Sequence, residues 1–301
     1  QVFLLCCLCV FPSPLHASPM GNCNGSDGGA CSGCPRGEQG TNMKALYNDP
    51  VPAVKRGPLG DRNSLPECTF ENGAKYKGEW LNGMRDGHGT QVWPDGARYV
   101  GDWIAGKASG QGRFEHGDGD VYEGSWLDDK AHGYGVYMHS DGSKYEGHWK
   151  DDQQDGEGKE NWPDGAKYHG QYKNGRKNGT GHFIWADGST FDGDLVDNDI
   201  QGHGVYRWRD GRNYEGQWSA NRMHGKGVFA WSDGRIYEGE YSMDMKEGRG
   251  VFRWPDGRWY EGQWLAGKQH GTGTYSLANG QTRSGTWAEG KRIQWNDSLS
   301  P

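Results

Sequence analysis

The segment Tyr145–Tyr168, YEGHWKDDQQDGEGKENWPDGAKY, contains one complete repeat and the first residue of the next. It begins with Tyr-x-Gly-x-Trp, continues through Gly-x-Gly and closes with an Asp-Gly pair. The position of its first residue recurs at a constant spacing of 23 residues in ten units. It is occupied by Tyr76, Tyr99, Tyr122, Tyr145, Tyr168, Phe191, Tyr214, Tyr237, Tyr260 and Arg283. Self-similarity at a fixed period in this range indicates an array of stacked structural repeats.

Each repeat has the pattern of a β-hairpin. Side chains alternate along a strand, so the Tyr, Gly and Trp of the first motif share one face and polar residues such as Glu146 and His148 share the other. An aromatic residue stands four places after the repeat start in nine of the ten units, with Leu195 as the exception. Seven places after the start comes Gly, Asp or Asn, the residues that tolerate left-handed backbone in a turn. The second strand then runs through Gly-x-Gly to the Asp-Gly turn.

Stacking would bury the aromatic face that a lone hairpin leaves in water. We therefore expect an all-β fold, an elongated single-layer antiparallel sheet of about twenty strands, which at ~4.8 Å per strand gives about 95 Å. The array is predicted over residues 67–287, with NGAK at Asn72–Lys75 as the end of a capping half-repeat. Residues 1–66 are expected to be a disordered leader, and residues 288–301 a tail. The predicted aromatic face, structural and available for interaction, contains Tyr76, Trp80, Tyr99, Trp103, Tyr122, Trp126, Tyr145, Trp149, Tyr214, Trp218, Tyr260 and Trp264.

The distribution of charge argues against one class of partner, and the distribution of cysteines shows how the array must be stabilised. The first 68 residues carry five basic and five acidic residues, so the whole net charge of −7 lies beyond residue 68. A surface that binds nucleic acid normally has a basic excess, which makes a nucleic-acid partner a poor expectation. All seven cysteines also precede residue 69, so packing rather than disulfides must stabilise the array.

No catalytic, cofactor or metal site is expected. GDWIAGKAS at Gly101–Ser109 is close to a phosphate-binding loop, but Ala108 replaces the required hydroxyl residue, and the near-motif recurs inside other repeats. His132, His224 and His270 occupy one repeat position, and adjacent repeats lie about 9–10 Å apart, too far for shared zinc ligation. The array contains neither Gly-x-Ser-x-Gly nor a Cys–His arrangement of the kind that nucleophilic catalysis uses.

The ten agreeing units resemble MORN repeats (membrane occupation and recognition nexus). The resemblance implies an elongated β array that acts as a non-catalytic scaffold for proteins, cytoskeletal ones among them, and for membrane lipid. It also implies a cytoplasmic location with membrane or cytoskeletal association. Two alternatives stay open: a fragment of a MORN-containing enzyme (a phosphatidylinositol phosphate kinase or a SET-domain lysine methyltransferase), or a radial-spoke component of cilia. A homodimer formed through the array ends is a further alternative.

Two features bear on membrane binding. Weak contacts to anionic lipid are expected from two basic clusters, Lys173, Arg176 and Lys177, and Arg207, Arg209 and Arg212. Met20-Gly21-Asn22-Cys23 offers a second start, with Gly21 as a myristoylation site and Cys23 as a palmitoylation site. Residues 1–19 are then translated leader; a truncated signal peptide and a gene-model artefact are the other interpretations.

Overall fold

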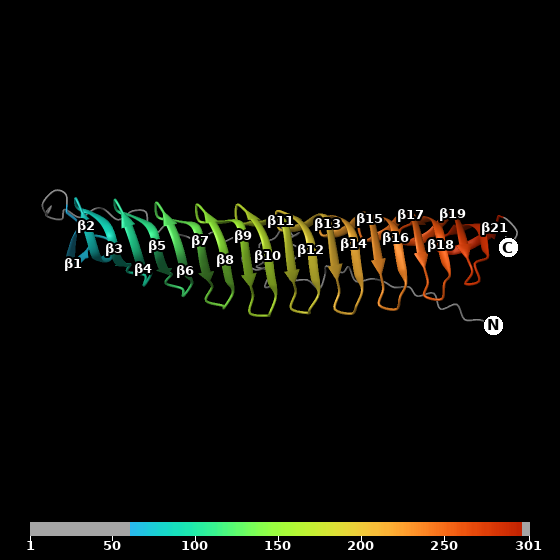
Figure 1. Cartoon of the computed structure of the whole chain (residues 1–301), viewed down its shortest axis with the longest axis horizontal. Helices are drawn as coiled ribbons and strands as arrows, with labels where there is room; N and C mark the ends of the chain where they lie inside the picture. The colour runs from blue at the N-terminus through green and yellow to red at the C-terminus, as the bar shows by residue number, and fades with distance from the viewer. Residues whose placement is uncertain (1–60, 297–301) are drawn as a thin grey trace. The chain divides into compact units, whose positions relative to one another are not determined.

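In the computed structural model, residues 61–296 are described, and every regular element among them is a β-strand (Figure 1). They divide into an N-terminal unit, residues 61–186 and 195–198, and a C-terminal unit, residues 187–194 and 199–296. The N-terminal unit contains β1 (Asn63–Thr69), β2 (Lys75–Leu81), β3 (Met84–Val92), β4 (Arg98–Ile104), β5 (Lys107–Glu115), β6 (Val121–Leu127), β7 (Lys130–Met138), β8 (Lys144–Lys150), β9 (Gln153–Asn161), β10 (Lys167–Lys173) and β11 (Arg176–Ile184).

β12 (Thr190–Val196) has residues in both units. The C-terminal unit continues with β13 (Asp199–Arg207), β14 (Asn213–Ser219), β15 (Arg222–Ala230), β16 (Ile236–Ser242), β17 (Met245–Arg253), β18 (Trp259–Leu265), β19 (Lys268–Ser276), β20 (Thr282–Ala288) and β21 (Lys291–Trp295). Within each unit, each strand pairs antiparallel with the strand before and the strand after it in the chain. The prediction of an all-β antiparallel array of 23-residue hairpins is confirmed.

The glycines of neighbouring strands pair with one another and form a continuous ladder across each unit. In the N-terminal unit the ladder passes through Gly78, Gly89, Gly101, Gly112, Gly124, Gly135, Gly147, Gly158, Gly170 and Gly181. The ring of Tyr99 lies directly over Gly101 and Gly112, where an added Cβ would overlap it. Glycine is therefore required here for close approach of the ring, at the expense of strand propensity.

A β-bulge follows each ladder glycine on the first strand of the hairpin. Between β4 and β5 the register shifts after Gly101, and Gly110 takes a φ of 109°. The shift frees two backbone groups, and side chains of the repeat satisfy both. The Tyr99 hydroxyl donates to the carbonyl of Asp102 at 3.1 Å, and the Asp102 carboxylate accepts from the N–H of Gln111 at 3.1 Å.

Aromatic rings connect consecutive repeats. The Tyr76 ring meets Trp80 of its own repeat edge-on at 5.2 Å and Trp103 of the next repeat at 5.5 Å. The Trp103 indole N–H also donates to the Gly89 carbonyl at 3.3 Å. T-shaped pairs of this kind contribute about 0.5–1.5 kcal/mol each beyond their burial. The repeats are thus held together by contacts between near neighbours in sequence.

A residue of the hairpin turn forms a pair of hydrogen bonds to the preceding repeat, here called the clamp, which the sequence pattern did not reveal. Asp129, seven places after Tyr122, has a φ of 66° as expected for a left-handed turn position. Its backbone N–H donates to the Ala108 carbonyl at 2.9 Å, and its carboxylate accepts from the Ala108 N–H at 2.7 Å. Asp152 and Asn221 bind the preceding repeat in the same way.

Paired strands extend past both expected limits of the array. β1 begins at Asn63, ahead of the expected start at residue 67, and pairs with β2. β21 lies within the expected tail and pairs with β20. Both strands cover an edge that would otherwise expose unpaired backbone groups. The expected disordered leader falls almost wholly outside the described residues.

Substituting Gly112 by Ala tests the fit of the tyrosine over the glycine pair. The new Cβ would overlap Tyr99, and overpacking of this kind costs about 1–3 kcal/mol. We expect Gly112→Ala to lower the denaturant midpoint of unfolding. Gly106→Asn is the control, because Asn198 and Asn221 occupy the equivalent turn position at φ of 77° and 64°. Equal midpoints for the two variants would contradict the packing argument.

Candidate functional site

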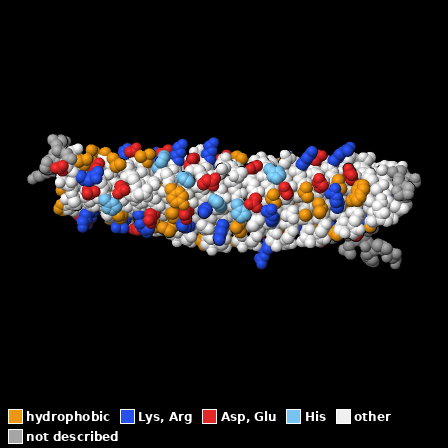
Figure 2. Space-filling model, in the orientation of Figure 1, with side chains coloured by type: hydrophobic (Ala, Val, Ile, Leu, Met, Phe, Trp, Pro, Cys, Tyr) orange, Lys and Arg blue, Asp and Glu red, His pale blue; other side chains and the backbone are white. Residues whose placement is uncertain are grey.

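The two faces of the sheet differ in what they offer a ligand, and side chains of both charges are exposed on the face seen in Figure 2. The predicted aromatic residues lie on the inner, buried face: Tyr99, Tyr122 and Tyr214 have 0% exposure, and none of the twelve exceeds 6%. Burial also raises the pKa of Tyr260 to about 12. These rings form the hydrophobic core, so a partner must be sought on the opposite, polar face.

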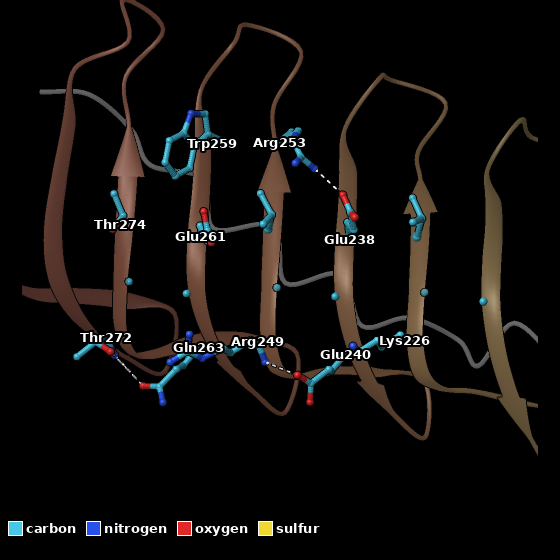
Figure 3. Close-up of a pocket in the computed structure, with 18 of the residues that line it drawn as sticks. Lys226, Glu238, Glu240, Arg249, Arg253, Trp259, Glu261, Gln263, Thr272 and Thr274 are labelled. Atoms are coloured by element: carbon cyan, nitrogen blue, oxygen red, sulfur yellow. Dashed lines mark hydrogen bonds and ion pairs between the residues drawn. The ribbon is translucent and has the colours of Figure 1, made fainter.

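The polar face of the C-terminal unit carries a groove of about 1100 Å³ that crosses β13–β20. Its floor is the backbone of the glycine ladder at Gly216, Gly227, Gly239, Gly250, Gly262 and Gly273. In Figure 3, Glu238 and Glu261 lie in one row, and Lys226, Glu240 and Arg249 lie in another, with Trp259 and Arg253 beyond the glutamates. The rows lie on either side of the floor because residues i and i+2 of a strand share a face about 6.7 Å apart.

The first row contains three glutamates, Glu215, Glu238 and Glu261, here called the glutamate row. They follow the repeat Tyr directly and lie on β14, β16 and β18. Glu238 accepts from Arg253 at 3.1 Å, an exposed ion pair. Among residues 61–296, no ion pair or hydrogen bond engages the carboxylates of Glu215 and Glu261. Two of the three acidic groups are therefore available to a ligand.

The second row alternates cations with side chains that accept backbone N–H groups. One of these acceptors, Glu240, is itself acidic: it lies opposite Lys226 and accepts from the Arg249 N–H at 3.4 Å. Gln217 accepts from the Lys226 N–H at 2.8 Å, and Gln263 accepts from the Thr272 N–H at 2.9 Å. The ammonium of Lys226 and the guanidinium of Arg249, here called the cation pair, form no ion pair within the described range. The groove thus presents unpaired charge of both signs on opposite sides of a backbone floor.

In the N-terminal unit, the two glutamates at the same repeat position are paired with basic side chains of the protein. Glu123 accepts from Arg113 at 3.0 Å. Glu146 accepts from Lys144 at 2.8 Å and from the Tyr134 hydroxyl at 2.9 Å, and these donors hold its pKa below the usual value. Because these carboxylates are already paired, a ligand gains less from binding them than from binding Glu215 or Glu261.

The basic candidates for lipid contact are mostly engaged within the protein. Lys177 pairs with Glu160 at 2.7 Å, packs over the Trp162 ring, and leaves only 13% of its side chain exposed, so it cannot reach a membrane surface. Arg207 pairs with Asp192 at 3.0 Å and Arg212 with Asp210 at 2.7 Å. Arg209 is exposed, and Lys173 and Arg176 line a small hollow with Asp197. Gly21 and Cys23 lie outside the described residues.

Histidine replaces tryptophan at one repeat position in two adjacent repeats. His116 and His139 occupy the position that Trp93 and Trp162 hold in flanking repeats. His139 Nδ1 lies 3.1 Å from Asp120, and the Tyr137 hydroxyl donates to the same carboxylate at 2.8 Å. The described part of the chain contains no group of three or more His, Cys, Asp or Glu arranged to hold a metal ion. It also contains no helix of the length and apolarity needed to cross a bilayer.

His116 predicts a local pH dependence of stability. Burial lowers its pKa, against the opposing charges of Asp118 and Asp120, and its Nε2 is buried without a partner. The folded pKa is below the unfolded value, so stability falls as pH drops from about 6.5 through the folded pKa. We expect His116→Trp, the residue of neighbouring repeats, to lose less stability between pH 7.5 and 5 than the unsubstituted chain, measured by denaturant unfolding. Equal losses would contradict it.

Likeness to solved structures is weak. The TCP10 domain of Danio rerio CPAP, in complex with a STIL peptide, is 12% identical, covers 79% of this chain and 100% of its own, with a TM-score of 0.42. The TCP domain of Drosophila melanogaster SAS-4, in complex with a proline-rich motif of Ana2, is 16% identical, covers 62% and 98%, with a TM-score of 0.33. These TM-scores are too low to support an argument. No curated protein matches the chain.

The family model of the MORN repeat matches nine consecutive units, at residues 76–98, 99–121, 122–144, 145–167, 168–190, 191–211, 214–234, 237–257 and 260–282. The expected tenth unit, which begins at Arg283, is outside the match, although its residues form β20 and β21. The match covers more than half of the chain and follows the observed hairpins unit by unit. The chain therefore belongs to the MORN repeat family.

Proposed function

We propose that the protein is a non-catalytic scaffold that binds a partner protein in the polar-face groove of its C-terminal unit. The observation that carries this proposal is the coexistence of unpaired charges, Glu215 and Glu261 on one side and Lys226 and Arg249 on the other, along a groove of about 1100 Å³. Charged groups left without partners on a rigid sheet favour a ligand that supplies the opposite charges.

The form of the groove favours a polypeptide over a small molecule. Small-molecule sites are concave, largely apolar and about 300–1,000 Å³ in volume. This groove is lined mainly by charged, polar and glycine residues on alternate strands. It crosses eight consecutive strands, from β13 to β20, a length that suits an extended chain. Because the aromatic rings are buried on the other face, binding need not disturb the core.

Photo-crosslinking from the groove tests this proposal. A photoreactive amino acid at Thr272, an exposed residue of the groove, is expected to capture a defined partner protein in cells that express the full chain. The matched control is Asn279, equally exposed on the turn after β19 and outside the groove lining. Mass spectrometry identifies the crosslinked peptides. Equal capture of the same partner from both positions, or from neither, would refute groove binding.

We further propose that the scaffold works in the cytoplasm and that acylation, rather than the array surface, supplies any membrane attachment. The support is the internal pairing of Lys177, Arg207 and Arg212, three of the six basic residues in the two clusters considered for lipid contact. Gly21 and Cys23 are the proposed acylation sites.

The mass of the N-terminal peptide of the native protein tests the acylation proposal. A peptide that begins at Gly21 and carries a myristoyl group is expected. A peptide that begins near Ser18 with a glycan on Asn24 would place the array outside the cell and refute the proposal.

A further inference from the structure

The glutamate row has a regular spacing set by the sheet. Glu215, Glu238 and Glu261 lie on alternate strands, with β15 and β17 between them. Neighbouring strands are about 4.8 Å apart, so successive glutamates are about 9.6 Å apart across the groove. Their cross-strand neighbours Val228 and Val251 are uncharged. The row is therefore a ladder of negative charge with a single repeat distance.

Among the regular backbone conformations, the polyproline II helix matches that distance most closely on one of its faces. A polyproline II helix has three residues per turn and rises about 3.1 Å per residue, which returns the same face every ~9.3 Å. In a β-strand, residues on the same face recur at about 6.7 Å and 13.4 Å, and the residue about 10 Å away points to the opposite face. An α-helix returns to the same face after seven residues, at about 10.5 Å, so its mismatch with the row accumulates to about 1.8 Å over the three glutamates.

We propose that the groove binds a polyproline II segment of a partner protein that carries Lys or Arg at every third residue. This inference rests on the proposed scaffold function and specifies the chemistry of its partner. The mismatch between ~9.3 Å and ~9.6 Å accumulates to about 0.6 Å over the three glutamates. Flexible Lys and Arg side chains absorb a difference of that size.

The charges of the groove favour this occupant at each glutamate. Glu215 and Glu261 have no ion-pair partner within residues 61–296, so binding a cation requires no internal pair to break. Glu238 would exchange its exposed pair with Arg253, in which the two side chains are 48% and 60% exposed. Exposed pairs of this kind are weak, so the exchange costs little.

The cation pair fits a second face of the same helix. Lys226 lies on β15 and Arg249 on β17, again two strands apart, so acidic residues at every third position of the segment would face both. Trp259, two residues before Glu261 on β18 and beside the glutamate row in Figure 3, offers an aromatic surface of the kind that proline-rich segments use. A segment with the repeat Arg-Pro-Glu satisfies both charged rows.

The experiment is calorimetric titration of the full chain with a peptide of four Arg-Pro-Glu repeats. The control peptide has the same composition, but its arginines alternate between spacings of two and four residues. We expect the regular peptide to bind more tightly than the control, and to bind less tightly as salt is added, because exposed charges are screened. Equal affinity for the two peptides would overturn the proposal.

Two matched variants locate the binding. Glu261→Gln removes an unpaired carboxylate of the groove and is expected to weaken binding about two- to fivefold. Glu123→Gln removes the carboxylate at the same repeat position in the N-terminal unit, outside the groove lining, and is expected to leave affinity unchanged. Equal effects of the two variants would also overturn the proposal. Circular dichroism of each variant verifies that the sheet is intact.

The peptide titration and the crosslinking experiment together distinguish a failure of the polyproline II inference from a failure of the scaffold proposal. If crosslinking from Thr272 captures a partner while the regular peptide binds no better than its control, the groove is a protein-binding site and the polyproline II inference alone is wrong. If crosslinking also fails, both are wrong.

Discussion

The fold depends on the contact between a tyrosine ring and a pair of glycines on adjacent strands. Tyr99 can lie over Gly101 and Gly112 only because neither glycine carries a Cβ. The ring then covers the backbone that glycine would leave exposed, and its hydroxyl binds the carbonyl that the neighbouring bulge releases. The residue that weakens a strand in isolation thus permits the packing that stabilises it in the array.

Each such contact is completed by the adjacent repeat. The edge-on contact of Trp103 on Tyr76, and the clamp from Asp129 to Ala108, both join units that are neighbours in sequence. A repeat therefore cannot bury its aromatic face alone, as is general for stacked repeat proteins. At the ends of the array, β1 and β21 supply strand pairing in place of a further repeat.

Burial of the aromatic face decides where binding can occur. Once the rings are used in the core, the polar face is the surface whose side chains differ from one repeat to the next. In the N-terminal unit this variation pairs Glu123 with Arg113. In the C-terminal unit it leaves Glu215 and Glu261 unpaired. Repeats with one consensus can thus differ in function through exposed residues that the consensus does not fix.

The hairpin repeat, its 23-residue period and the sorting of aromatic and polar residues to opposite faces can be read from the sequence, because alternation along a strand is a local property. The sequence did not reveal that the aromatic face is closed to ligands, that Lys177 is largely covered by Glu160 and Trp162, or that Asp129 binds the backbone of Ala108. Glu123 and Glu261 occupy the same position of their repeats, between the first Tyr and the ladder Gly. Arg113 nevertheless lies opposite Glu123, whereas Val251 lies opposite Glu261. Only the tertiary structure decided which glutamates are unpaired, because strand register and its bulges set each side chain's neighbours.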